Sequence, residues 1–155
     1  MSKTLYTRDI LKLAMSNAHE GRLENYDGSA ELRSRTCGSR ILVDVQLSKT
    51  GALLDLGMDI HACAFGQASA SILSNGATGK TLEELEDTAA QLASYLAKKT
   101  AVPKGWPDLE MLAVAQDYPG RHAAILLPFQ TLIAAIKDAL SYKSFAINGG
   151  EAGDG

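Results

Sequence analysis

Two cysteines and two of the three histidines carry most of the chemistry that this sequence offers. Cys37 lies in a turn-like Cys-Gly-Ser segment, and Cys63 lies where a strand pattern changes to a run of small residues typical of a closely packed helix. A helix N-terminus presents free N–H groups and a partial positive charge, which favour the thiolate that acts as nucleophile and metal ligand. His61 precedes Cys63 by two positions, and His122 follows much later. The pattern indicates metal or redox chemistry, with two inert core cysteines as the alternative.

The strands that must position these residues are visible as alternating polar and apolar side chains. Weak alternation over 30–36 and strong alternation over 41–47 predict two strands, and a third follows over 54–61. Turn residues at 37–39 and 48–51 join them, so we expect an antiparallel meander. Its third strand is expected to bury Leu54, Leu56, Met58 and Ile60. The opposite face then carries Asp59 and His61, with Cys63 just beyond the strand.

Helical spacing predicts the elements that pack on this sheet. An amphipathic helix is expected from a cap at Thr7 to about His19, followed by a surface loop over 20–29. The later helices are expected at 64–73, ended by Asn75-Gly76; from a capping box at Thr81 to Lys98 or Lys99; at 108–115, capped by Asp108; and at 122–142, with a kink or shifted start at Pro128.

Size and composition narrow the class of protein. The 155 residues suffice for one domain, which we place at 1–145, with a glycine-rich and acidic tail at 146–155 that is expected to be disordered. A net charge of -3 and scattered basic residues give no footprint for nucleic acid. No apolar run approaches a membrane span, and the polar start is no signal peptide. We therefore expect a cytoplasmic protein with reduced thiols and with protein or small-ion partners.

Five motifs in order resemble the iron-sulfur cluster assembly scaffold family, which comprises the NifU N-terminal domain, IscU and SufU proteins. The matching stretches cover most of the chain: 21–25 (Gly-Arg-Leu-Glu-Asn), 36–38 (Thr-Cys-Gly), 63–65 (Cys-Ala-Phe), 68–71 (Ala-Ser-Ala-Ser) and 118–121 (Tyr-Pro-Gly-Arg). The resemblance implies an α+β fold of the SufE/IscU-like type, with a three-stranded antiparallel sheet and helices packed on it. It also implies a protein that is not an enzyme.

In that family, three cysteines and an aspartate converge at one tip of the molecule. There they hold a nascent cluster, or zinc in many SufU proteins, and accept sulfur from a cysteine desulfurase. Thiolates are soft ligands that suit both iron-sulfide clusters and tetrahedral zinc. The resemblance therefore makes Cys37 and Cys63 ligands of iron, a [2Fe-2S] cluster or zinc. Its implied partners are a cysteine desulfurase and other iron-sulfur assembly proteins.

The sequence departs from the family pattern at two positions. Ser39 stands where the family has the aspartate of its Cys-Gly-Asp motif, and Ala124 stands where the third cysteine is expected. The absent cysteine is the one usually assigned to receive or ligate sulfur. His122 and His61 are the candidate replacement ligands. A helix that already includes residues 122 and 124 would point their side chains about 200° apart, which argues against His122. A helix that begins later, near Pro128, would let His122 turn inward.

Several arrangements remain open for a site with two cysteines. Two chains could each donate a thiolate pair to one [2Fe-2S] cluster, which predicts a symmetric homodimer with facing tips. Zinc could be held by two sulfurs, a histidine and a water. Cys37 and Cys63 could instead form a reversible disulfide. The alternative function is a degenerate scaffold homologue that binds no metal and acts as an interaction adaptor; a sulfur-transfer enzyme is a third reading.

Overall fold

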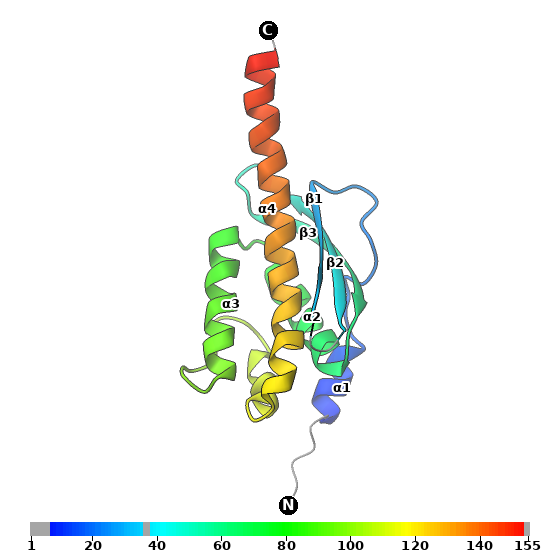
Figure 1. Ribbon diagram of the computed structural model, residues 1–155, viewed down its shortest axis with the longest axis vertical. Coiled ribbons are helices and arrows are strands. Elements are labelled where there is room, and N and C mark those ends of the chain that lie inside the picture. Colours follow the sequence, from blue (N-terminus) through cyan, green and yellow to red (C-terminus); the bar gives the residue numbers. More distant parts are fainter. Residues whose placement is uncertain (1–6, 36–37, 154–155) are drawn as a thin grey trace, which may run out of the picture.

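The computed structural model describes residues 7–35 and 38–153, with side chains as far as residue 141. Its three strands form a single antiparallel sheet in the order β1-β2-β3: β1 (Gly28–Arg33), β2 (Arg40–Leu47) and β3 (Leu53–His61). The helices cover one face of this sheet (Figure 1). The predicted α+β fold, with its antiparallel meander, is confirmed.

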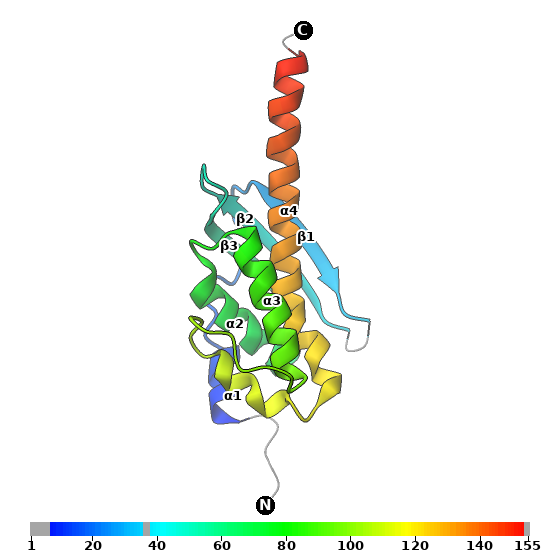
Figure 2. The ribbon, with the colours of Figure 1, turned by 90° about the vertical axis from the view of Figure 1, so that its left-hand side faces the viewer.

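The helices pack around one long central helix, α4. Their bounds are α1 (Arg8–Ala14), α2 (Ala64–Ala77), α3 (Leu82–Leu96) and α4 (His122–Gly153), with two short 3-10 helices, η1 (Leu109–Ala115) and η2 (Pro119–Arg121). Helix α4 contacts the sheet, α2 and α3, while α1 packs on α2. Figures 1 and 2 show that α1, η2 and the first turn of α4 lie at one end of the molecule, and that the C-terminal part of α4 projects beyond the opposite end.

The strand pattern holds in β2 and fails at the start of β3. Ile41, Val43, Val45 and Leu47 are all buried, as their alternation predicts. In β3 the predicted core residue Leu54 is 58% exposed, whereas Leu53 is buried. The reason is an irregularity in the β2–β3 pairing at Gln46/Leu47, where Leu47 pairs with Leu53. A shift by one residue moves a side chain to the other face of a sheet, and periodicity alone does not reveal such a shift.

Helix α4 packs closely enough to need special residues on its neighbours. A Cβ atom at Gly28 of β1 would lie 2.5 Å from the Ala135 carbonyl oxygen, so only glycine fits there. Pro128 lies inside α4, where its missing N–H leaves the Ala124 carbonyl without its usual helical donor. On α2, the Ser69 hydroxyl donates to the next carbonyl, that of Ile125, at 2.5 Å.

The backbone of α4 continues as a helix to Gly153, across most of the segment expected to be disordered. No side chain of that segment is described, and disorder of 146–155 stays a prediction. Within α4 and η2, the stretch Pro119–Ser141 has the length and apolar composition of a membrane span, although the sequence pattern suggested no such run. Of its most apolar window, 56% is buried inside the protein, as in the core helix of a globular domain.

Two predicted helix ends are corrected. Helix α1 ends at Ala14 rather than near His19, and the Asn17 side chain accepts a hydrogen bond from the His19 N–H just beyond it. Helix α2 does not end at Asn75-Gly76 but continues to Ala77. Gly76 instead makes room for Trp106, because a Cβ atom there would lie 2.5 Å from the indole ring.

Two predicted caps have different outcomes. The capping box of α3 is confirmed, since the Thr81 hydroxyl accepts from the Glu84 N–H and the Glu84 carboxylate accepts from the Thr81 N–H. The segment after Asp108 is a 3-10 helix, and the Asp108 side chain makes no capping hydrogen bond. Asp108 has φ +71°, in the left-handed region, so its contribution is a backbone turn rather than a cap.

Two buried serines of α2 give a paired test of the core. Ser71 is fully buried, and its hydroxyl has no hydrogen-bond partner among the described residues. We expect Ser71→Ala to raise the free energy of unfolding by up to about 1 kcal/mol, because it removes an unsatisfied polar group. Ser69→Ala should lower it by about 1 kcal/mol, because it removes the buried hydrogen bond that the hydroxyl donates to the Ile125 carbonyl. Urea unfolding curves with unchanged m-values would measure both changes in the free energy of unfolding. Equal effects of the two substitutions would contradict this account.

Candidate functional site

Cys63 is the N-cap residue of α2, as the sequence predicts. Its backbone is extended (φ -68°, ψ 173°), and its carbonyl accepts the first helical hydrogen bond, from the Gln67 N–H at 2.9 Å. The side chain is half-buried and makes no capping hydrogen bond within the described chain. Cys63 is also free of any disulfide. The thiol therefore lies at the helix N-terminus and is not used as a capping group.

The β1–β2 hairpin lies at the same end of the sheet as Cys63. The pairing register places Arg40, at the start of β2, opposite His61, at the end of β3. Within the hairpin, Gly38 has φ +71°, which favours glycine, and the Ser34 N–H donates to the Ser39 carbonyl at 2.8 Å. Cys37 itself lies outside the described residues. Its distance to Cys63 therefore stays a prediction.

Ala124, at the position of the family's third cysteine, packs against the first turn of α2. It is fully buried in the first turn of α4. A Cβ atom built on Gly66 would lie 3.9 Å from the Ala124 Cβ and 3.4 Å from its carbonyl oxygen. Because Gly66 is three residues after Cys63, residue 124 lies about one helical turn from the N-cap. A methyl group rather than a ligand occupies this position.

His61 and Asp59 form a pair on the outer face of the sheet, on the same side of β3 as predicted. The His61 Nε2 atom lies 3.4 Å from Asp59 Oδ1, and the His61 side chain is 59% exposed. An imidazole this exposed has room to turn toward a metal ion, should one be held near Cys63. Whether it binds a metal stays a prediction.

His122 is the first residue of α4, and its ring is already engaged. The Nε2 atom lies 2.8 Å from the Ala115 carbonyl oxygen. A carbonyl only accepts, so Nε2 carries the proton and Nδ1 keeps the lone pair. The helix includes both residue 122 and residue 124, which places their side chains about 200° apart. A role for His122 as a ligand through Nδ1 stays a prediction, and the helix geometry counts against it.

Comparison with known proteins identifies the family of this chain. Residues 5–123 match the family described as the NifU-like N terminal domain.

The chain belongs to the NifU-like N-terminal domain family.

Relatives of this NifU-like chain match along almost its full length. It is 24% identical over 136 residues to the iron-sulfur cluster assembly scaffold protein IscU of Thermotoga maritima, covering 87% of this chain and 94% of the relative. A crystal structure of a nitrogen-fixing NifU-like protein (N-terminal) from Brucella abortus is 29% identical, with a TM-score of 0.82 over 88% of this chain and 95% of that chain. The putative SUF-system scaffold protein FiSufU from Fervidobacterium islandicum AW-1, at 22% identity, shares the fold, with a TM-score of 0.78 over 85% and 96% of the two chains.

The structure of the NifU-like chain adds a buried carboxylate that the sequence analysis did not single out. Asp44 of β2 is fully buried and accepts two hydrogen bonds from Arg22, at 2.6 Å from Nε and 3.0 Å from Nη2. The Ser29 hydroxyl and the Leu23 N–H also donate to it, at 2.7 Å and 3.1 Å. The sequence feature that could have indicated this ion pair is an acidic residue between two core valines, together with an arginine in the preceding loop.

This carboxylate fastens the early loop onto the outer face of the sheet. The Gly21 N–H donates to the Met58 carbonyl at 2.6 Å, and a Cβ atom at Gly57 would lie 2.5 Å from the Gly21 carbonyl oxygen. The loop thus touches β3 a few residues before the strand leads into Cys63. Burial acts to raise the pKa of Asp44, but the hydrogen bonds outweigh it and hold the pKa below its usual value.

Charged side chains flank the hairpin end of the sheet. On the outer face, Arg40 donates to the Glu31 carboxylate at 2.7 Å, and this hydrogen bond lowers the pKa of Glu31. Ser39, in the place of the family's aspartate, is buried. Among the side chains described, at residues 7–35 and 38–141, no group of three or more His, Cys, Asp or Glu is arranged to hold a metal ion.

The Asp44 carboxylate makes a pH-dependent contribution to stability. We expect Asp44→Asn to lower the free energy of unfolding by about 2 kcal/mol at neutral pH, since charge-assisted hydrogen bonds are lost. Because the folded pKa lies below the ordinary value, the contribution is present above about pH 4 and is lost as the pH falls through the folded pKa. Urea unfolding of both proteins between pH 7 and pH 3 should show the difference shrinking. Glu24→Gln, on the exposed part of the same loop, is the control, and a pH-independent difference would contradict the assignment.

Proposed function

We propose that this chain is an iron-sulfur cluster assembly scaffold-like protein in which Cys37 and Cys63 bind iron, a [2Fe-2S] cluster or zinc. The observation that carries the proposal is the Cys63 thiol, which is half-buried and makes no capping hydrogen bond. It lies at the same end of the sheet as the β1–β2 hairpin. Cys37 precedes Gly38 of that hairpin in the sequence. The family relationship supports the same role, which is to hold and pass on a cluster rather than to catalyse a reaction.

The cluster is cargo, and the chain's part is to supply soft ligands with open positions around them. Two thiolates leave half of a tetrahedral set vacant. A second copy could supply the other pair, His61 could complete a zinc site with a water, or His122 could contribute Nδ1 after rotating. A cysteine desulfurase and other assembly proteins in the cytoplasm are the proposed partners, as sources and acceptors of sulfur and clusters.

The second candidate function is an adaptor that binds no metal. Two observations favour it, since Ala124 is buried where the family has its third cysteine and Ser39 stands in the place of the aspartate. A chain that had lost its ligands could keep the fold and still dock on assembly proteins. The absent third cysteine also counts against a sulfur-transfer enzyme.

Metal content separates the two candidates. After anaerobic incubation with iron and sulfide, or with zinc, we expect the wild type to retain metal and Cys37→Ser and Cys63→Ser each to fall to background. Serine is a favoured N-cap residue, so Cys63→Ser should keep α2 intact. Elemental analysis and visible absorbance would measure the outcome. A wild type without iron, colour or zinc would favour the adaptor.

The same measurement distinguishes the completing ligands. Loss of metal in His61→Ala or His122→Ala, with no change in His19→Ala, would assign a histidine to the site. Retention in all three, together with two chains per cluster, would assign the remaining thiolates to a second copy.

Restoring the third thiol provides a gain-of-function test. Residue 124 lies against the first turn of α2, so Ala124→Cys should tighten zinc binding by about tenfold or more, which is ~1.4 kcal/mol. The added sulfur costs some stability in a packed core. Ala123→Cys, at the exposed neighbouring position, is the matched control. Equal affinities for the two variants, measured by competition with a chromogenic chelator, would show that residue 124 does not face the site.

A further inference from the structure

Helix α3 presents a charged and small-residue seam to solvent. Its buried side, which includes Leu85, Leu92 and Leu96, faces the core. The seam on the opposite side consists of Glu83, Asp87, Ala90 and Ser94, spaced as the a and d positions of a heptad. The helix lies on the outside of the molecule, beside α4 and away from the sheet (Figures 1 and 2).

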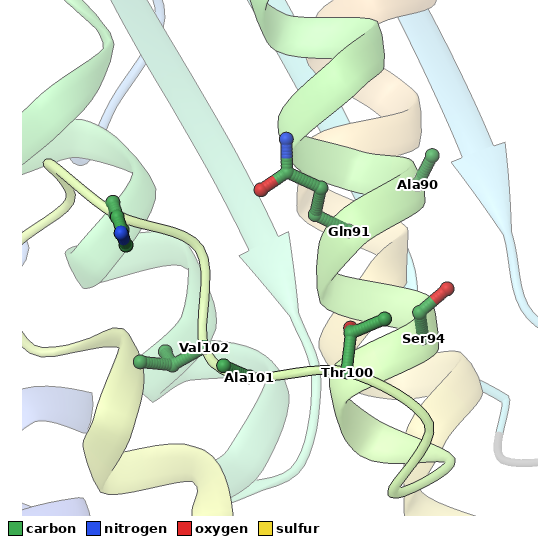
Figure 3. A pocket seen from close by; sticks show the side chains of 7 residues that line it. Ala90, Gln91, Ser94, Thr100, Ala101 and Val102 are labelled. Carbon is green, nitrogen blue, oxygen red and sulfur yellow. The ribbon is translucent and has the colours of Figure 1, made fainter.

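An apolar groove runs beside this seam. It has a volume of about 620 Å³ and lies between α3 and the segment that follows it. Ala90, Gln91 and Ser94 line one wall, and Ala101, Val102 and Lys104 line the other (Figure 3). The small side chains at the centre allow another backbone to approach closely. The site of Cys63 lies at the N-terminus of α2 and takes no part in this groove.

Charge is segregated along α3 and the segment that follows it. Acidic residues, among them Glu83 and Asp87, occupy the first half of α3, and Lys99 follows its end; Lys104 lies on the groove wall formed by the segment that turns back beside α3. Two other charges are already used, because Glu86 pairs with Lys137 and Lys98 pairs with Asp117. Glu83, Lys99 and Lys104 form no ion pair within the described chain and are exposed.

We propose that the outer face of α3 pairs antiparallel with the same face of a second copy of this chain. Such a two-fold contact brings the acidic half of each helix against the basic end of the other. The same face is therefore complementary in charge to a second copy of itself. A two-fold centred on Leu92 along the helix places Ala90 opposite Ser94 of the second copy. It also places the first turns of α3, which carry Glu83 and Asp87, against the C-terminal end of the other copy's α3, which Lys99 follows. A parallel arrangement would set like charges together.

The size of the surface sets the expected affinity of the dimer. A helix of 15 residues spans about 22 Å. One face of a helix about 22 Å long and about 10 Å wide is smaller than the ~800 Å² per partner of a standard stable interface. We therefore expect a dimer that dissociates in the micromolar range or above and weakens with salt, because exposed charges are screened.

Charge exchange between variants tests the antiparallel pairing. All proteins carry Cys37→Ser and Cys63→Ser, which removes dimers bridged by a cluster or a disulfide and makes the result independent of the proposed function. One variant adds Glu83→Lys and Asp87→Lys, which makes the two charges of the seam basic. The other adds Lys99→Glu and Lys104→Glu, which makes the basic charges at the end of α3 and on the groove wall acidic. Sedimentation velocity at low salt would give the oligomeric state, and circular dichroism would verify the fold.

The expected result is a concentration-dependent dimer for the parent, monomers for each charge variant alone, and a mixed dimer when the two are combined. Glu24→Lys, on the opposite side of the molecule, is the control and should leave the parent dimer unchanged. A monomeric parent at 200 mM salt or below would overturn the proposal, as would charge variants that dimerise alone. A parent dimer that all variants retain would place the contact elsewhere.

Discussion

The close packing of α4 against the sheet and α2 is the constraint on which the candidate site depends. Gly28 lets the helix lie directly on β1, and Gly66 lets it touch the first turn of α2. The Ser69 hydroxyl then ties α2 to α4 near Pro128, where the helical hydrogen-bond pattern is incomplete. These contacts fix the position of the α4 N-terminus along α2, and with it the separation between residue 124 and Cys63. A looser helix would separate the position of the third family cysteine from the other thiol.

A second fastening acts from the opposite face of the sheet. The Arg22–Asp44 pair holds the early loop on β2 and β3, and the loop touches the backbone of Met58 shortly before the chain reaches Cys63. The thiol therefore follows a strand whose middle part, at Gly57 and Met58, is covered by the early loop as well as by the core. Such a rigid approach suits a residue that must present sulfur in a fixed direction without being buried. The same frame would serve the proposed adaptor as well as the proposed metal site.

The sequence allowed the fold to be predicted well, because alternation in Ile41–Leu47 and the capping box at Thr81 are local signals that tertiary contacts did not override. The errors arose from contacts between distant residues. Leu54 is exposed because strand pairing shifts by one residue, and Asn75-Gly76 does not end α2 because Gly76 accommodates Trp106. At the site, the N-cap position of Cys63 and the shared face of Asp59 and His61 followed from period and spacing. The engagement of His122 with Ala115 and the burial of Asp44 depend on packing, which no single-sequence pattern encodes.

Trp106 gives the molecule a built-in optical reporter. It is the single tryptophan of the chain, is 5% exposed, and donates from Nε1 to the Ile72 carbonyl at 3.0 Å. Its ring lies next to Phe129 of α4, with ring centroids 5.7 Å apart, and beneath the Lys80 ammonium group. Fluorescence from this indole therefore comes from one place, where α2, α4 and the segment after α3 meet. A shift in its emission would register movement of α2 from the end opposite Cys63.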